Sequence, residues 1–410
     1  MLSRMKFEIE PMVAEMLDQL PRSIWTSKTS TFFDPAIGGG QFVRAIEQRL
    51  RNAGHSDENI RSRVFGFEES DLHIRFAVNK YKLVGQYAKM SYNKFFELDN
   101  TMKFDVVVGN PPYQNPGKSK GEKLWYRFIF KTIDLVKDDG YLSLVTPNSW
   151  MSGGTNLSSG KRGVLKDIFK KYQLVNATVS GITKKYFKGV GIEISQWTVK
   201  KTAIHTTTQI STSSDNFVVD FKEIEFLSPD PDVISNSIVK KVFFSKDPKV
   251  TAIYFQKTVK RGTKKESKTK TSEFLYEHWL HGDGLNSTLE TIFLEEKNSK
   301  SLEFKKILVP MGSRYWQPYY DNKKIGVASQ GFAIPLNEND TYEGFLTVYQ
   351  SKLFKYLNFN LQIQKNGFMK TSLVRNLPSL DLSKKWSDKA IYKHFGLSQE
   401  EIDYVETNVK

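Results

Sequence analysis

The residues whose types and spacing could best support binding or catalysis form a short stretch, Asn110-Pro111-Pro112-Tyr113. This stretch follows the apolar run Phe104–Gly109. That run is rich in β-branched residues and predicts a buried strand. The two prolines lack backbone donors and fix their φ angles, so an amide and an aromatic ring stand on a stiff turn. In open α/β sheets, ligands bind at the carboxyl ends of strands. The stretch therefore predicts a ligand site, although Asn and Pro are also ordinary turn residues.

A second stretch that could bind a ligand is a glycine-rich loop. It lies between the predicted strand Thr31–Phe33 and a helix whose apolar face includes Ile46 and Leu50. Glycines at such a junction let the backbone approach a ligand closely. The loop and its flanks read Asp34-Pro35-Ala36-Ile37-Gly38-Gly39-Gly40-Gln41-Phe42. The loop lacks the Lys-Ser/Thr of a phosphate-binding loop, and its spacing is not that of a dinucleotide fingerprint. An ordinary tight turn remains the alternative.

An acidic residue, Glu68, ends the next predicted strand, Val64–Glu68, about thirty positions after the glycine loop. A carboxylate at that place accepts hydrogen bonds from both hydroxyls of a ribose in other nucleoside-binding α/β folds. Together, the loop and the acidic strand end indicate a ribonucleoside cofactor. The alternative is a surface Glu at a helix start, because Glu69 and Asp71 lie beside it.

The elements that position these residues alternate along the first half of the chain. Apolar spacing predicts a helix over residues 8–20 with Pro11 in its first turn, and a helix face of Leu124, Phe128, Ile133 and Val136. Asp138-Asp139-Gly140 predicts a turn into a strand. The remaining predictions are the strand Tyr141–Val145, the helix Val164–Tyr172 and the strands Leu174–Val179 and Ile192–Lys200. This alternation predicts an α/β, doubly wound sheet whose last strand runs antiparallel.

Composition limits the function classes. The chain has 410 residues, no Cys and a formal net charge of +15, from 60 Lys and Arg against 45 Asp and Glu. The absence of Cys excludes disulfides and thiolate zinc sites and suits a reducing cytoplasm, and we expect no metal centre. We find no signal peptide and no apolar run long enough for a membrane span, so we predict a cytoplasmic protein without a membrane partner. The basic excess favours a polyanionic partner.

The composition and the pattern of apolar residues change near residue 201, which predicts two domains, 1–200 and 201–410. The polar stretch 205–215 predicts a linker, and the later apolar runs are short and rich in aromatics. Lys257–Lys270 is a basic segment that predicts a loop. The final segment, Ser387–Val405, predicts two helices, the second opened by Ser398-Gln399-Glu400-Glu401.

The loop at 34–42, the acidic Glu68 and the turn 110–113 together resemble the amino-group DNA methyltransferases that use S-adenosylmethionine. Their order resembles the gamma arrangement of adenine-N6 enzymes, and the Eco57I-like branch is most similar. The resemblance implies a Rossmann-like methyltransferase catalytic domain at 1–200, and at 201–410 a mixed α+β target-recognition domain with a helical C-terminal segment. It also implies double-stranded DNA as substrate, with a cognate restriction endonuclease as a further partner.

The resemblance implies roles for individual residues. Asn110, Pro111, Pro112 and Tyr113 would be catalytic, and Phe187, before the last strand, would stack on the target base with Tyr113. Cofactor contacts would come from the loop residues, Glu68 and Asn110, and from Pro11, where the family's usual Thr-Pro is Glu10-Pro11 here. Asn93 is the nearest candidate for the family Asp that reads the cofactor adenine. DNA contacts would come from Lys257, Lys260, Arg261, Lys264, Lys265 and Arg314.

The chemistry implied is methyl transfer to adenine N6. The Asn110 side-chain oxygen and the Pro111 carbonyl would accept hydrogen bonds from the amino group, whose lone pair would then point at the sulfonium methyl. A duplex hides this nitrogen, so the base must be flipped out. Two rivals keep the fold: a protein-glutamine methyltransferase acting on a release factor, and a non-catalytic DNA-binding protein on the same scaffold.

Overall fold

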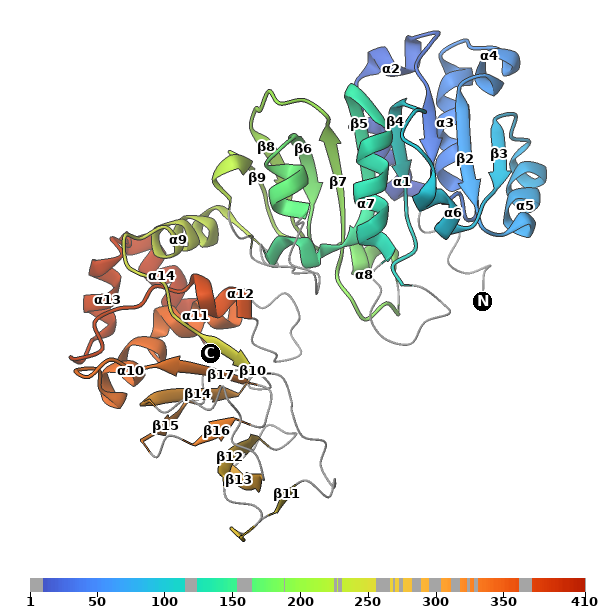
Figure 1. The fold of residues 1–410 in the computed structure, drawn as a ribbon. Coiled ribbons are helices and arrows are strands. Elements are labelled where there is room, and N and C mark those ends of the chain that lie inside the picture. Colours follow the sequence, from blue (N-terminus) through green and yellow to red (C-terminus); the bar gives the residue numbers. More distant parts are fainter. Residues whose placement is uncertain are drawn as a thin grey trace. The chain divides into compact units, whose positions relative to one another are not determined.

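The computed structural model describes residues 10–114, 124–152, 164–187, 189–224, 227, 231–255, 266–267, 270–272, 276–281, 289–294, 304–310, 318–322, 325–327, 331–360 and 371–409. The chain divides into two compact units, Met1–Glu225 and Phe226–Lys410 (Figure 1). The first unit ends 25 residues beyond the domain boundary that the sequence pattern predicted at residue 200, because strands continue past that residue.

One nine-stranded sheet forms the first unit within the described residues. Its order is β3-β2-β1-β4-β5-β7-β6-β8-β9, and β7 is antiparallel to both β5 and β6, as the sequence predicts. The strands are β1 (Phe32–Asp34), β2 (Val64–Glu68), β3 (Gln86–Lys89), β4 (Phe104–Gly109), β5 (Val136–Pro147), β6 (Gln173–Thr178), β7 (Ile194–Lys200), β8 (Thr208–Ser211) and β9 (Asn216–Val219). β1 to β5 run parallel, so β1, β2 and β4 all end at the same edge.

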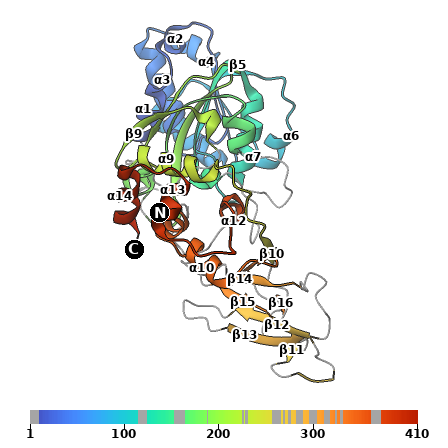
Figure 2. The same cartoon turned by 90° about the vertical axis from the view of Figure 1, so that its left-hand side faces the viewer.

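Helices cover both faces of this sheet (Figure 2). Phe32 packs in one apolar cluster with Met12 of α1 and Ile46 of α3. The next residue, Phe33, points to the other face and belongs to a group of aromatic rings with Phe95 of α6. The helices are α1 (Glu10–Asp18), α2 (Arg22–Thr26), α3 (Gln41–Asn52), α4 (Asp57–Arg61), α5 (Asp71–Tyr81), α6 (Tyr92–Glu97), α7 (Leu124–Leu135) and α8 (Ile182–Tyr186), with short 3₁₀ or π turns at Asn148–Ser152, Leu165–Phe169 and Phe221–Glu223. The carboxyl ends of the strands are thereby left for a site.

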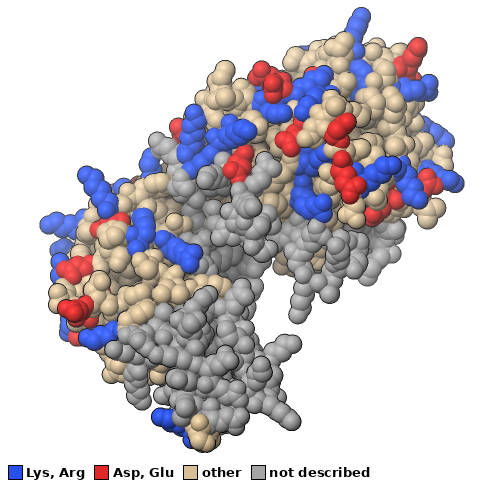
Figure 3. Space-filling view, viewed as in Figure 1, with Lys and Arg blue, Asp and Glu red and all other residues tan. Residues whose placement is uncertain are grey.

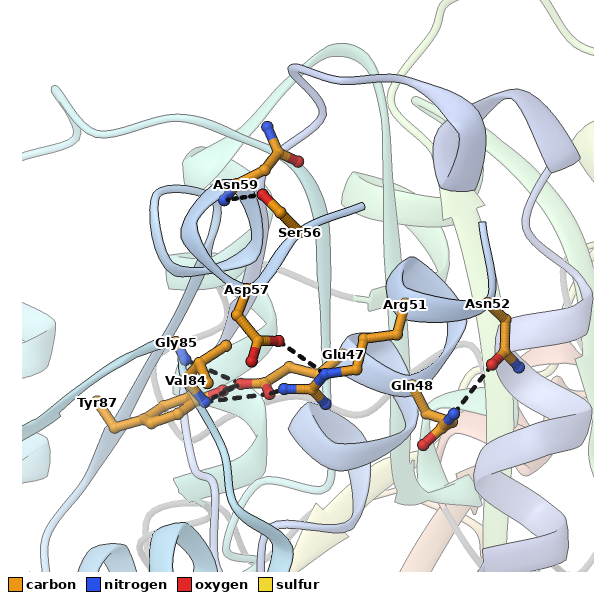
Figure 4. A network of polar contacts seen from close by, with 10 residues as sticks. All are labelled: Glu47, Gln48, Arg51, Asn52, Ser56, Asp57, Asn59, Val84, Gly85 and Tyr87. Atoms are coloured by element: carbon orange, nitrogen blue, oxygen red, sulfur yellow. Dashed lines mark hydrogen bonds and ion pairs between the residues drawn. The ribbon is translucent and has the colours of Figure 1, made fainter. Parts of the chain in front are cut away.

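A buried carboxylate, Glu47 on α3, ties that helix to the start of β3 (Figure 4). Its oxygens accept the N–H groups of Val84 (3.0 Å) and Gly85 (2.9 Å) and the hydroxyl of Tyr87 (2.6 Å). Arg51, one turn along the helix, donates to it at 2.9 Å. These bonds satisfy a carboxylate that is 0% exposed, and they fix the helix that follows the glycine loop.

Two local predictions were wrong, and a third differs from the structure in the type and length of the helix. Val136 is not on the helix face: α7 ends at Leu135 and β5 begins at once, with a register irregularity against β4 where a turn was predicted. The predicted helix at 164–172 is in large part the π turn Leu165–Phe169. The predicted linker at 205–215 contains β8, because Thr208 and Ile210 are buried where this strand pairs with β6.

The second unit is mixed α+β, in agreement with the predicted fold class. Its described strands form two four-stranded sheets, β10-β17-β14-β15 and β11-β13-β12-β16. They are β10 (Ile253–Phe255), β11 (Glu266–Ser267), β12 (Tyr276–His281), β13 (Leu289–Leu294), β14 (Lys306–Pro310), β15 (Tyr319–Asp321), β16 (Gly326–Val327) and β17 (Gly331–Pro335). The helices are α9 (Val233–Phe243), α10 (Tyr342–Tyr349), α11 (Lys352–Asn360), α12 (Thr371–Asn376), α13 (Asp388–His394) and α14 (Gln399–Asn408).

The two helices predicted at the C-terminus are α13 and α14, and the cap expected for α14 is present. The Ser398 hydroxyl accepts the Glu401 N–H (3.3 Å), and the Glu401 carboxylate accepts the Ser398 N–H (2.6 Å). This reciprocal pair provides acceptors for two backbone N–H groups at the start of the helix. It explains why the sequence pattern located the helix.

The described surface mixes charges of both signs. On the face shown in Figure 3, Lys and Arg are interspersed with Asp and Glu over both units. Among the described residues, no helix is long and apolar enough to cross a membrane.

Candidate active site

The glycine loop joins β1 to α3 through two residues in the left-handed region. Gly38 has φ +52° and Gly40 has φ +84°. A Cβ on Gly40 would lie 2.6 Å from the Cβ of Ala77 on α5, so this position requires Gly for both conformation and space. The Ile37 N–H donates to the Phe67 carbonyl at 3.0 Å, which holds the loop against the end of β2.

Glu68 meets the loop at that point. Its side chain is 5% exposed, and Oε2 accepts the Gly38 N–H at 2.9 Å. Oε1 accepts the Ser70 N–H at 3.1 Å and lies 3.4 Å from Nδ1 of His73. The structure therefore brings the two predicted cofactor elements together, and protein donors occupy both carboxylate oxygens.

Asp34, at the end of β1, is a buried carboxyl with one oxygen unpaired. Its side chain is 1% exposed, Oδ1 accepts the Ala36 N–H at 2.9 Å, and Oδ2 has no hydrogen-bond partner. Burial raises the pKa of Asp34 to about 7; the bond from Ala36 opposes this shift and the charge of Glu68 adds to it. A Cβ on Gly109 would lie 2.9 Å from Asp34 Oδ1, so the ends of β1 and β4 approach closely.

The turn after β4 carries two more buried polar atoms without partners. They are Oδ1 of Asn110 and the hydroxyl of Tyr113. Burial raises the pKa of the Tyr113 hydroxyl, which therefore stays protonated. Pro111 is buried, whereas Pro112 is half-buried. Unpaired buried polar atoms are uncommon in native proteins, and the two here and Oδ2 of Asp34 all belong to residues at the carboxyl edge of the sheet.

Phe187 lies at the end of α8 and is 6% exposed. It belongs to the same apolar cluster as Ile182, Tyr186 and Ile194, and Tyr113 packs against this cluster. The hydroxyl of Tyr186 donates to Glu15 of α1 at 2.7 Å, which ties this segment to the first helix. The structure thus brings Tyr113 and Phe187 to one cluster, with the Phe187 ring packed as a core residue.

Three other predicted cofactor residues have different surroundings. Pro11 is exposed in the first turn of α1, and Asn93 is exposed on α6. Phe42 is 5% exposed and packs in the core cluster between α3 and the sheet. The six predicted DNA contacts, Lys257, Lys260, Arg261, Lys264, Lys265 and Arg314, lie outside the described residues.

The sequence interpretation missed Tyr92, the neighbour of Asn93. Burial raises the pKa of its hydroxyl, and so do the nearby charges of Glu68, Glu69 and Asp34. Its ring packs edge-on against Phe128 of α7, with centroids 5.4 Å apart. Ser91 caps α6 through its side chain and makes Tyr92 the first helical residue, but this pattern predicts only the helix start and not what packs against Tyr92.

Within the described residues, no group of three or more His, Asp or Glu side chains is placed to hold a metal ion. The site instead combines a backbone loop, two buried carboxyl groups, an amide and aromatic rings.

The site lies within a stretch that matches a known family. Residues 22–177 match the model of the Eco57I restriction-modification methylase. The match confirms the resemblance that the motifs predicted, over the glycine loop, Glu68 and the Asn110 turn.

Two curated proteins are similar to this chain over short segments. An uncharacterized adenine-specific methylase of Mycoplasma pneumoniae is 37% identical over 81 residues, which are 18% of this chain and 19% of that protein. A putative type II restriction enzyme and methyltransferase of Methanocaldococcus jannaschii is 26% identical over 153 residues, 35% of this chain and 11% of that protein. The chain thus matches a fifth or less of the length of these relatives.

The fold resembles that of a solved structure, the type IIL restriction-modification enzyme MmeI in complex with DNA. The TM-score is 0.51 at 11% sequence identity, covering 99% of this chain and 76% of that chain. At this identity the likeness concerns the fold alone, and it agrees with the predicted methyltransferase-type sheet.

Proposed function

We propose that this chain is a DNA methyltransferase that transfers a methyl group from S-adenosylmethionine to adenine N6. The observation that carries the proposal is the Asn110 side chain. Its Oδ1 is buried without a partner on a turn fixed by two prolines, at the edge where the family's glycine loop ends. An unpaired acceptor of this kind suits a donor that the substrate brings.

The residues present fit the proposed cofactor. Bound there, S-adenosylmethionine supplies a methyl group on a positively charged sulfur. Asp34 and Glu68 are carboxyl groups suited to a cation and to ribose hydroxyls, and Asp34 Oδ2 has an unused acceptor position. Gly38 and Gly40 leave the loop without side chains, so that the ligand can contact the backbone. Tyr92 adds an aromatic wall close to both carboxyl groups.

Asn110 and Pro111 orient the acceptor nitrogen. The Asn110 Oδ1 and the Pro111 carbonyl each accept one hydrogen bond from the N6 amino group. These bonds favour a more pyramidal nitrogen, whose lone pair is shared less with the ring and is available for attack on the methyl group. In-line positioning of the two substrates supplies much of the rate gain. Because the leaving group departs readily, no strong base is needed before attack.

Access of the base requires flipping from the duplex, at a cost of a few kcal/mol. Tyr113 and Phe187 offset part of this by stacking, at roughly 1–3 kcal/mol for each base on an aromatic surface. Phe187 is 6% exposed, so stacking on its face requires the segment after α8 to shift. The second unit and the basic segment Lys257–Lys270 would contact DNA, and a cognate endonuclease would complete a restriction-modification pair in the cytoplasm.

The test is the chemical identity of the product. Purified protein, labelled S-adenosylmethionine and unmethylated duplex DNA are incubated, and the DNA is digested to nucleosides for mass spectrometry. The proposal predicts labelled N6-methyldeoxyadenosine, lost in Asn110→Ala. Label on another base would refute adenine N6 as the acceptor. Label only in an added release factor would assign the chain to glutamine methylation instead.

A further inference from the structure

Asp34 is a buried acid in surroundings that disfavour its charged form. It is 1% exposed, receives one backbone hydrogen bond, from Ala36, and has an unpaired Oδ2. Glu68, the neighbouring carboxylate, differs because both of its oxygens accept N–H bonds. The two buried carboxyl groups therefore differ in the hydrogen bonds that they accept from the protein, and Asp34 accepts fewer of them.

The groups that face Asp34 supply no positive charge. Glu68 from β2 acts on it with a negative charge, while Tyr92 from α6 and Tyr87 from β3 present neutral hydroxyls. Tyr87 already donates to Glu47 at 2.6 Å, and burial and that carboxylate raise the pKa of its hydroxyl. The Nδ1 atom of His73 lies 3.4 Å from Oε1 of Glu68. No Lys or Arg of the described chain is among the groups that shift Asp34.

Burial accordingly raises the pKa of Asp34 to about 7. The close approach of Gly109, where a Cβ would be 2.9 Å from Oδ1, leaves no room for an added side chain on that flank. A cation from outside the protein is the missing partner that would stabilise the ionised form.

We propose that Asp34 is a neutral carboxylic acid in the ligand-free protein below neutral pH, and that binding of the cationic cofactor releases its proton to solvent. The inference rests on the proposed function for the identity of the ligand. The O–H bond of the carboxyl group breaks, the proton goes to the buffer, and the carboxylate remains beside the positive charge of the ligand. The site thus presents a second negative charge beside Glu68 only when a cation binds.

The number of protons released is measured by isothermal titration of S-adenosylmethionine in buffers of different ionisation enthalpy. The slope of the binding enthalpy against the buffer enthalpy gives that number. We expect about 0.9 proton at about pH 6 and about 0.5 at about pH 7, from a group with a pKa near 7. Asp34→Asn should bind with no proton release, whereas Asp71→Asn, at a partly exposed acid of α5 that pairs with Arg75, should match the wild type.

Difference infrared spectroscopy gives a second readout that needs no variant. The ligand-free protein at about pH 6 should show the C=O band of a protonated carboxyl group, and this band should vanish when S-adenosylmethionine is added. Binding without proton release and without loss of the band would overturn the inference and leave the cofactor assignment intact. Absence of binding in the wild type would instead remove the proposed cofactor and the inference with it.

Discussion

Replacing Glu47 with Ala is expected to lower the free energy of unfolding by about 3–5 kcal/mol. The variant leaves the N–H groups of Val84 and Gly85 and the hydroxyl of Tyr87 without their acceptor (Figure 4). Each buried donor left unpaired costs about 1–3 kcal/mol, and water that enters the space keeps the sum near the lower end. Arg51 adds little, because it is partly exposed and keeps Asp57.

The measurement is urea unfolding, with hydrogen–deuterium exchange to locate the effect. Because the chain has two compact units, a single global transition cannot be assumed, and exchange over residues 83–87 reports the first unit directly. The matched control is Gln48→Ala on the same helix, whose exposed amide bonds only to Asn52 and whose loss should cost less than about 0.5 kcal/mol. A loss below about 1 kcal/mol for Glu47→Ala, or equal losses in both variants, would refute the reasoning.

Two further predictions concern the cofactor side of the site. Gly40→Ala should destabilise by about 2–4 kcal/mol, because its φ is +84° and its Cβ would meet Ala77 at 2.6 Å. Gly54→Ala, at φ +87° with nothing within 4 Å, should lose only about 1 kcal/mol when both variants are compared by urea unfolding, and equal losses would contradict the steric account. Asp34 has a pKa of about 7 in the folded protein, whereas the ordinary pKa of an Asp is 3.8. Between these pH values the folded state keeps a proton that the unfolded chain has lost, so the free energy of unfolding falls as pH rises. Asp34→Asn should therefore gain roughly 2–3 kcal/mol on the wild type between about pH 5 and about pH 8, and a pH-independent difference would exclude a protonated Asp34.

The central strands were predictable because their apolar runs are buried or half-buried on both faces. Val64–Glu68 and Phe104–Gly109 have the bounds expected from the sequence. The antiparallel last strand was predicted because no helix was expected between the last two strands, and its direction is confirmed although the short helix α8 lies between them. The polar strand β8 was not predictable from its composition. Its burial depends on pairing with β6, which only the tertiary fold supplies.

The candidate site was predictable where motif and strand end coincide. The glycine loop and Glu68 were expected together, and the Gly38–Glu68 hydrogen bond joins them. Tyr92 and Glu47 were missed for the same physical reason. A Tyr at a helix start and a Glu within a helix are ordinary surface residues by pattern, and only the elements packed against them show that Tyr92 is half-buried and Glu47 is buried.

The most direct test of the account is single-turnover methyl transfer to duplex DNA by wild type and Asn110→Ala, at cofactor concentrations that saturate both. Asn110 is placed to hold the acceptor nitrogen, so the account predicts a rate at least about a hundredfold lower in the variant, with S-adenosylmethionine affinity changed far less. A rate within about threefold of the wild type would contradict the role of Asn110, and with it the proposed mechanism.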